Sequence, residues 1–204
     1  MSRLRDKRTR HDRYYKRAKD QNYAARSVYK LDEIDRRFKL FKKGKRVLDL
    51  GCRPGSWLQF ALERIGHKGF AVGLDRQPLD IALPGNAAVV VGDVLQMDPA
   101  ELRAVLPGDG GCFHVVLTDM APDTSGVAFA DQVRSVELFC CALDLATQVG
   151  CPGGAFVGKL FMGEGFDETL ARVRQHYKKC KTVRPDATRK SSREVYLVAQ
   201  GLKS

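Results

Sequence analysis

Five positions that could do chemistry follow five apolar runs of the chain: Gly51, Asp75, Asp93, Asp119 and Lys159. Each run is short and rich in branched aliphatic residues, which is typical of a buried strand. Ligands of parallel sheets bind beyond the carboxyl ends of the strands, so we expect these five residues to lie at one site. Packing alone does not predict an ionisable group at four of five strand ends. We therefore interpret the set as functional.

The first of these ends predicts a ligand-binding turn. Residues 46–50 read as a buried strand, Gly51 ends it, and residues 56–65 read as a helix. This order opens a dinucleotide-type binding unit, in which glycine lets the backbone turn sharply and approach a ligand. The turn from Gly51 to Gly55 has neither the Gly-x-Gly-x-x-Gly spacing nor the Lys-Ser/Thr pair of a P-loop.

An acid, Asp49, lies in the strand just before that turn. A carboxylate there can hold an ammonium group, which a pyrophosphate cofactor lacks. The position favours an amino-acid-bearing nucleoside such as S-adenosylmethionine, although an ordinary strand–helix turn remains an alternative. Asp75 follows Gly51 by 24 residues, close to the spacing of about 20 expected for an acid on a ribose diol.

The positive charge of the chain is concentrated in two segments. Residues 1–46 hold eighteen Lys/Arg and six Asp/Glu, whereas residues 47–204 hold seventeen and eighteen. Residues 172–193 hold nine Lys/Arg and one acid, and residues 184–193 read as a loop. Localised basic charge favours a nucleic-acid partner over a membrane. A solvated tail is the alternative, and we favour it for the first dozen residues.

Composition predicts one domain that needs no disulfide or metal crosslinks to be stable. A chain of 204 residues buries about 70% of its unfolded surface. No apolar run approaches the ~18 residues of a membrane span, and no secretory signal is evident. Asp6, Asp12 and Asp20 argue against a mitochondrial presequence, so we expect a cytoplasmic protein. The six cysteines form no Cys-x-x-Cys pair, and we expect all six to be reduced thiols rather than a disulfide or zinc framework.

The periodicity predicts an α/β domain with a mainly parallel sheet. We expect a basic, partly flexible extension over residues 1–26, a helix over 27–43 and a catalytic core over 46–204. Further strands are expected at 70–74, 87–91, 113–117, 155–159, 181–183 and 194–199. Further helices are expected at 79–82, 98–106, 131–149 and 166–177. Tyr14 and Tyr15 lie among basic residues and could stack on bases.

Several ordered motifs resemble the FtsJ/RrmJ family of ribosomal RNA ribose 2′-O-methyltransferases. The resemblance covers about residues 11–203 and is carried by Ser27 to Asp35, Val47 to Gly51, Pro54-Gly-x-Trp57, Gly92-Asp93, Asp119 to Pro122, Gly158 to Phe161, and Arg189 to Tyr196. Ser56 and Arg53 depart from the family pattern, which has small residues there. Ser56 fits the turn if its φ is negative. We therefore expect the chain to bind S-adenosylmethionine despite these departures, with at most a lower affinity.

The resemblance implies a Rossmann-like fold of seven strands with the last strand antiparallel, and helices on both faces. It places a catalytic tetrad on Lys30, Asp119, Lys159 and Glu194. It places the cofactor, S-adenosylmethionine, at Gly51, Gly55, Trp57, Asp75, Asp93 and Asp119, with Trp57 as a wall of the pocket. It implies an RNA substrate, and large-subunit ribosomal RNA in the assembled subunit is favoured over tRNA. Separately from the resemblance, we expect no metal and a monomeric enzyme.

The expected reaction transfers a methyl group to a ribose hydroxyl, whose proton a base must take. Lys159 is our candidate. Burial and Lys30 favour its neutral form, whereas Asp119 and Glu194 favour its charged form, in which it would orient the hydroxyl instead. Two other classes remain open: a non-catalytic RNA-binding protein and a small-molecule O-methyltransferase. The basic segment has no purpose in the second of these.

Overall fold

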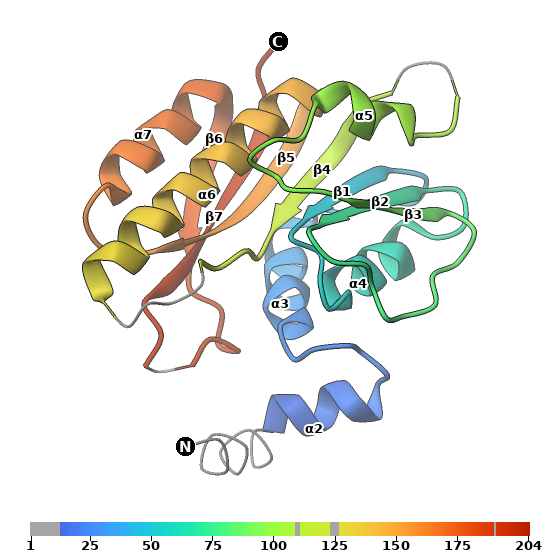
Figure 1. Cartoon of the computed structure of the whole chain (residues 1–204), viewed down its shortest axis with the longest axis horizontal. Helices are drawn as coiled ribbons and strands as arrows, with labels where there is room; N and C mark the ends of the chain where they lie inside the picture. Colours follow the sequence, from blue (N-terminus) through green and yellow to red (C-terminus); the bar gives the residue numbers. More distant parts are fainter. Residues whose placement is uncertain (1–12, 109–110, 123–126, 190) are drawn as a thin grey trace.

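A single seven-stranded sheet organises the molecule, in the order β3-β2-β1-β4-β5-β7-β6 (Figure 1). The computed structural model describes residues 13–108, 111–122, 127–189 and 191–204. Strands β1 to β5 pair in parallel, and β7 runs antiparallel between β5 and β6. The strands are β1 Arg46–Leu50, β2 Phe70–Asp75, β3 Ala87–Val91, β4 Phe113–Thr118, β5 Gly150–Phe161, β6 Tyr177–Val183 and β7 Glu194–Leu202. The expected sheet and its antiparallel last strand are confirmed.

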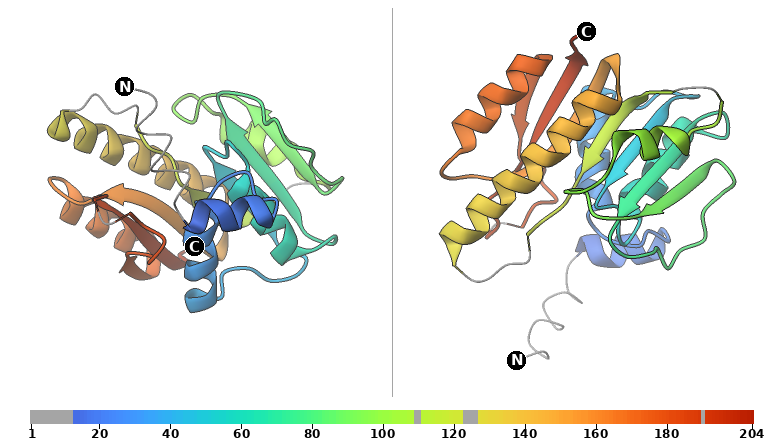
Figure 2. Two further views of the ribbon diagram at one scale, coloured as in Figure 1. Left: turned by 90° about the horizontal axis from the view of Figure 1, so that it is seen from below. Right: turned by 45° about the horizontal axis from the view of Figure 1, so that its top comes forward.

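Helices cover both faces of this sheet (Figures 1 and 2). They are α2 Arg13–Asp20, α3 Val28–Phe38, α4 Ser56–Ile65, α5 Pro99–Ala104, α6 Ala128–Val149 and α7 Phe166–His176. One apolar core joins α3 and α4 to one face, and a second joins α5, α6 and α7 to the other. Within the described ranges, no helix is long and apolar enough to span a membrane.

The expected helix over 27–43 is shorter in the structure because its end is capped early. Lys39 adopts a left-handed conformation with φ 54°, and its N–H bonds the carbonyl of Asp35. The Asp35 carboxylate accepts from the backbone N–H groups of Leu40 and Phe41 at 2.9 and 3.2 Å. These contacts direct residues 40–45 away from the helix and toward β1.

Four other expectations about elements need correction. Strand β6 begins at Tyr177, before the expected residue 181, because Tyr177 pairs with Leu202 of β7. Residues 79–82 form no helix but part of an irregular loop. Strand β5 begins at Gly150, earlier than expected, because Gly150 pairs with Phe113 of β4. The helix α2 was not expected at all, and buried Ala18 anchors it. Tyr14 of α2 packs against Tyr29, with ring centroids 5.5 Å apart, which leaves Tyr15 as the more exposed aromatic.

The expectation of six reduced thiols is wrong for two cysteines. Cys112 and Cys151 form a disulfide with a Cα–Cα distance of 4.9 Å. Cys112 directly precedes β4 and Cys151 is the second residue of β5, so the pairing of Phe113 with Gly150 brings them together. The two cysteines are 39 residues apart in sequence, and only the strand register predicts their contact. Cys52, Cys140, Cys141 and Cys180 are free.

Candidate active site

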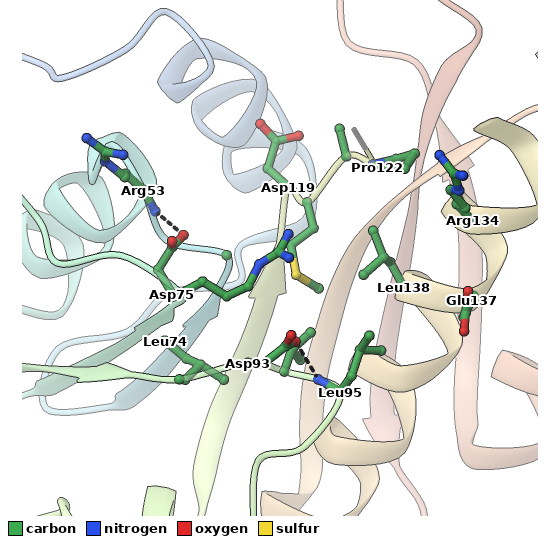
Figure 3. A pocket seen from close by; sticks show the side chains of 16 residues that line it. Arg53, Leu74, Asp75, Asp93, Leu95, Asp119, Pro122, Arg134, Glu137 and Leu138 are labelled. Carbon is green, nitrogen blue, oxygen red and sulfur yellow. Dashed lines mark hydrogen bonds between the residues drawn. The ribbon is translucent and has the colours of Figure 1, made fainter. Parts of the chain in front are cut away.

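A cavity of about 490 Å³ lies beyond the carboxyl ends of β1 to β4 (Figure 3). Four residues predicted from strand ends line it: Gly51, Asp75, Asp93 and Asp119. Arg134, Glu137 and Leu138 of α6 close the opposite wall. The fifth strand-end residue, Lys159, does not line this cavity but contacts Asp119. The sheet therefore brings all five residues to one region.

The two acids at β2 and β3 are oriented by backbone donors. The Asp75 carboxylate accepts from the N–H groups of Arg53 at 3.0 Å and Gln77 at 3.1 Å. The Asp93 carboxylate accepts from the N–H of Leu95 at 3.0 Å. Each carboxylate oxygen has two lone pairs, so both acids can still accept from the hydroxyl or amino groups of a ligand.

Two glycines allow the turn after β1 to be tight. Gly51 has φ +72°, and a Cβ there would lie 2.1 Å from Cγ of Met120. Gly55 has φ +109°, and a Cβ there would lie 2.3 Å from Cδ1 of Ile81. Gly51 lines the cavity, whereas Gly55 does not and is covered by Ile81.

The residues that depart from the family pattern fit this turn. Ser56 is the first residue of α4, and its hydroxyl lies 3.0 Å from the hydroxyl of Ser27. The Arg53 guanidinium bonds Gln77 and forms an ion pair with Asp80 at 3.1 Å. Arg53 thus has its partners in the loop after β2, whereas Ser56 has its partner at the start of α3.

Acidic charge accumulates around the first cavity. Asp49 is 1% exposed, and its Oδ2 has no hydrogen-bond partner among the described residues. Burial, followed by the charges of Asp119 and Asp75, raises the pKa of Asp49 well above its usual value. A ligand that carries positive charge would offset this accumulation, and a nucleoside with an ammonium group fits the donors and acceptors present.

The four expected catalytic residues form two ion pairs. Lys159 Nζ lies 3.1 Å from the Asp119 carboxylate and donates to the Asp119 carbonyl at 2.5 Å. Lys30 Nζ lies 2.5 Å from the Glu194 carboxylate. Asp119 follows β4, Lys159 lies in β5, Glu194 begins β7, and Lys30 comes from α3.

A fifth residue, Tyr196, joins the two pairs and was not among the expected site residues. Its hydroxyl donates to the Asp119 carboxylate at 2.6 Å and accepts from Lys30 Nζ at 3.2 Å. Tyr196 lies two residues after Glu194 on the same strand, so both side chains point to one face. That alternation was the sequence signal that could have identified it.

The charges around Tyr196 and Asp119 decide which of these two side chains carries the proton of their hydrogen bond. Burial alone would raise the pKa of Asp119, but the Lys159 and Lys30 ammonium groups and the Tyr196 hydroxyl outweigh it, and the pKa is lowered. Burial, followed by the Asp119 and Glu194 carboxylates, raises the pKa of Tyr196 well above its usual value. Asp119 is therefore the acceptor and Tyr196 the donor of their hydrogen bond.

Trp57 does not wall the cavity, contrary to expectation. It is 3% exposed and packs on Tyr196, with ring centroids 5.8 Å apart. Its indole N–H donates to the carbonyl of Ser27 at 2.9 Å. Trp57 thus packs behind Tyr196 and links α4 to the start of α3.

A second cavity, of about 370 Å³, lies on the other side of the tetrad. Lys30 and Glu194 line it, together with Arg26, Ser27, Ala187, Arg189, Ser191 and Ser192. It shares no lining residue with the first cavity. The contacts among Lys30, Tyr196 and Asp119 therefore connect the two cavities.

The two basic segments predicted from sequence meet at this second cavity. The Arg26 guanidinium donates to the carbonyl of Ala187 at 2.5 Å. Burial, followed by the charge of Arg189, lowers the pKa of Arg26. Two guanidinium groups facing the same cavity favour an anion there, such as a phosphate. Within the described part of the chain, no group of His, Cys, Asp and Glu is arranged to hold a metal ion.

Comparison with known proteins identifies the family of this chain. A sequence model of the FtsJ-like methyltransferase family matches residues 23–202. The chain is 46% identical over 192 residues to ribosomal RNA large subunit methyltransferase E of Syntrophobacter fumaroxidans. The aligned residues make up 94% of this chain and 96% of that relative. It is 47% identical over 192 residues to the protein of the same name from Sorangium cellulosum, and the aligned residues make up 94% of this chain and 87% of that protein.

Solved structures show the same fold. A ribosomal RNA methyltransferase from Plasmodium falciparum superimposes with a TM-score of 0.77 at 28% identity, over 88% of this chain and 98% of that one. The fibrillarin of Aeropyrum pernix, whose structure contains bound S-adenosylmethionine, superimposes with a TM-score of 0.59 at 15% identity, over 85% and 76%. At that identity, the likeness to fibrillarin concerns the fold alone.

Proposed function

The chain belongs to the FtsJ-like methyltransferase family, and from this we propose that it transfers the methyl group of S-adenosylmethionine to a ribose 2′-hydroxyl of large-subunit ribosomal RNA. The observation that carries the proposal is the series of side-chain contacts between the two cavities, which runs from Lys30 through Tyr196 and Asp119 to Lys159. One cavity suits a nucleoside with positive charge, and the other suits the phosphates of an RNA.

The residues of the first cavity fit S-adenosylmethionine. Asp75 would hold the ribose diol and Asp93 the adenine amino group, since both are oriented acceptors. Gly51 leaves room for the amino-acid end beside Asp119. When bound, S-adenosylmethionine supplies a methyl group on a positively charged sulfur. Two carboxylates that line the cavity, Asp75 and Asp119, favour such a cation, whose charge would in turn favour ionisation of the buried Asp49.

The second cavity would hold the nucleotide that is modified. Arg26 and Arg189 would bind its phosphates, and the Lys30–Glu194 pair would fix its ribose. The 2′-hydroxyl would then point through the tetrad toward the first cavity. Holding two reactants in line contributes much of the rate of a transfer reaction, up to about 7–11 kcal/mol in favourable cases.

Lys159 would act on the 2′-hydroxyl itself. A neutral amine would take the hydroxyl proton as attack proceeds, whereas an ammonium would orient the oxygen and stabilise its developing negative charge. The structure has Lys159 in an ion pair with Asp119. Tyr196 and Lys30 would keep Asp119 ionised, so that the orientation of Lys159 is maintained during transfer.

The test is to incubate the protein with radiolabelled S-adenosylmethionine and either total RNA or purified large ribosomal subunits, and then to analyse nucleosides. We expect label in a 2′-O-methyl nucleoside, with assembled subunits as the better substrate. Label in tRNA alone would keep the reaction and change the substrate. Cofactor binding without label in any RNA would overturn the proposal in favour of a small-molecule acceptor.

A further inference from the structure

A third cavity, of about 580 Å³, lies along the edge strand β6. Its charged lining residues are all basic: Arg174, Lys178, Lys179, Lys181 and Lys203. Phe38 at the end of α3 and Gln200 of β7 are among its uncharged lining residues, and Gln200 donates to the carbonyl of Phe38 at 3.1 Å. We refer to these seven residues as the β6 groove.

Three of the five cations have no partner in the described part of the chain. No ion pair or side-chain hydrogen bond there involves Lys178, Lys179 or Lys181, and all three are exposed. Lys203 differs, because its Nζ donates to the carbonyls of Arg174 and Gln175 at 3.0 and 2.8 Å and so caps α7. Capping of α7 therefore accounts for the position of Lys203, but it does not account for the three lysines of β6.

Protection of the sheet edge explains lysines on β6 but not every cation of the groove. Lysine is the charge most used on edge strands to prevent other chains from pairing with them, whereas Arg174 belongs to α7 and lines the same groove. Residues 47–204 hold eighteen acids and seventeen bases, yet the lining of the β6 groove includes no acid. This segregation indicates an anionic partner rather than a general surface property.

The β6 groove is distant from the tetrad, although the polypeptide leads from one to the other. Lys181 pairs with Val198 and Lys179 with Gln200, four and six residues beyond Glu194. At about 3.3 Å per residue, these positions lie roughly 13 and 20 Å along β7 from the catalytic acid. Strand β6 ends at Val183, where the basic loop 184–193 begins and leads back to the second cavity.

We propose that the β6 groove binds the phosphate backbone of an RNA segment that flanks the modified nucleotide. A nucleotide placed at the tetrad is too far away to occupy the groove, so the groove must contact another part of the same RNA. Flexible lysine side chains suit phosphates, which they contact without reading the bases. The inference rests on the proposed function, since it requires an RNA substrate.

The test compares two double variants that lose the same charge. Lys179→Gln/Lys181→Gln removes two cations from the β6 groove. The control, Lys68→Gln/Arg103→Gln, removes two exposed cations from the loop before β2 and from α5, outside both basic segments of the chain. Affinity for a protein-free transcript of large-subunit ribosomal RNA is measured across salt concentrations, and thermal melting checks that both variants fold. Lys178→Gln/Lys181→Gln replaces the groove variant if the first does not fold.

We expect the groove variant to bind the transcript about 10-fold more weakly at 0.1 M salt, with a salt slope smaller in magnitude by about 1.4, which corresponds to two lost contacts to single-stranded phosphates. The control should stay within twofold of the unchanged protein. A short RNA that carries only the acceptor nucleotide and its neighbours should be methylated at the same rate by all three proteins, because it cannot reach the groove.

Equal losses in the groove variant and the control would overturn the inference. So would normal binding of the transcript together with weakened binding of assembled subunits, because the partner would then be a ribosomal protein. Failure of the proposed function is a distinct result, namely that the unchanged protein methylates neither the transcript, the short RNA nor the subunit.

Discussion

The hydroxyl of Tyr196 donates to the Asp119 carboxylate at 2.6 Å, and this contact joins the two halves of the site. On one side Asp119 pairs with Lys159, and on the other Tyr196 accepts from Lys30, which pairs with Glu194. The buried tyrosine thus lies between two cations and two carboxylates. Its ring is held by Trp57, which is itself bonded to the start of α3.

Replacing Tyr196 by Phe should impair methyl transfer more than cofactor binding. The variant keeps the ring against Trp57 but leaves Asp119 and Lys30 without the hydroxyl that links them. We expect kcat to fall about 10- to 100-fold, on the scale of a lost hydrogen bond to charged groups of about 1.5–3 kcal/mol. Single-turnover methylation and cofactor titration measure the two effects separately. A normal kcat would show that the hydroxyl has no role in transfer.

Replacing Lys159 by Ala should abolish transfer while affinity for S-adenosylmethionine stays within a few-fold, because Lys159 does not line the first cavity, where we propose that this cofactor binds. Lys159→Arg separates the two proposed roles, since arginine stays protonated and can orient but cannot act as a base. Partial activity of the Arg variant would support orientation, and complete loss would support the base. Full turnover by the Ala variant would contradict both.

Replacing Gly51 by Ala should weaken cofactor binding and folding together. The residue has φ +72°, and the added Cβ would meet Met120, whose side chain lines the cavity. We expect a loss of about 1–3 kcal/mol in the free energy of unfolding. Gly85→Ala is the matched control, because nothing lies within 4 Å of a Cβ there. Equal stability of the two variants in denaturant titrations would contradict the argument.

The sequence predicted those site residues that follow a local rule. Asp75 and Asp93 come directly after apolar runs, so the parallel sheet alone was enough to place them together. Tyr196 was missed because its role depends on the pairing of β7 with β5, which sets Lys159 opposite it. Trp57 was assigned to the cofactor cavity by resemblance, but the direction of the side chain from α4 places it behind Tyr196.

The short helix expected at residues 79–82 shows the limit of local patterns. Four residues carry too little periodicity to separate a helical turn from a loop that packs apolar side chains. In the structure, Ile81 and Leu79 lie against the turn at Gly55, so their apolar character serves that contact. The disulfide between Cys112 and Cys151 was hidden for a related reason, because register and not sequence spacing brings it together.

The disulfide makes a direct prediction for thiol counting. Protein denatured without reductant should titrate four thiols, those of Cys52, Cys140, Cys141 and Cys180, and six after reduction. Closing a loop of this length stabilises a fold by about 2–4 kcal/mol. Cys112→Ser/Cys151→Ser should therefore unfold at lower denaturant concentration, whereas Cys180→Ser should differ little. Six thiols before reduction would show that the bond does not form.

His114 should make stability depend on pH near neutrality. Its Nδ1 accepts from the backbone N–H of Arg46 at 3.2 Å, which requires an unprotonated nitrogen. Burial, followed by the charges of Lys45 and Arg46, lowers the pKa of His114 below its usual value of 6.5. The unfolded chain therefore binds a proton more readily than the folded one, and stability is lost as pH falls below about 6.5.

One such group changes the free energy of unfolding by at most about 1.4 kcal/mol per pH unit. Asn at position 114 can still accept from Arg46 but does not titrate. We expect His114→Asn to flatten the decrease in unfolding free energy between about pH 7.5 and pH 5.5, measured by denaturant titration at each pH. Other carboxylates and histidines are common to both proteins, so they cancel in the difference. Parallel stability curves for the two proteins would exclude His114 as the source of the pH dependence.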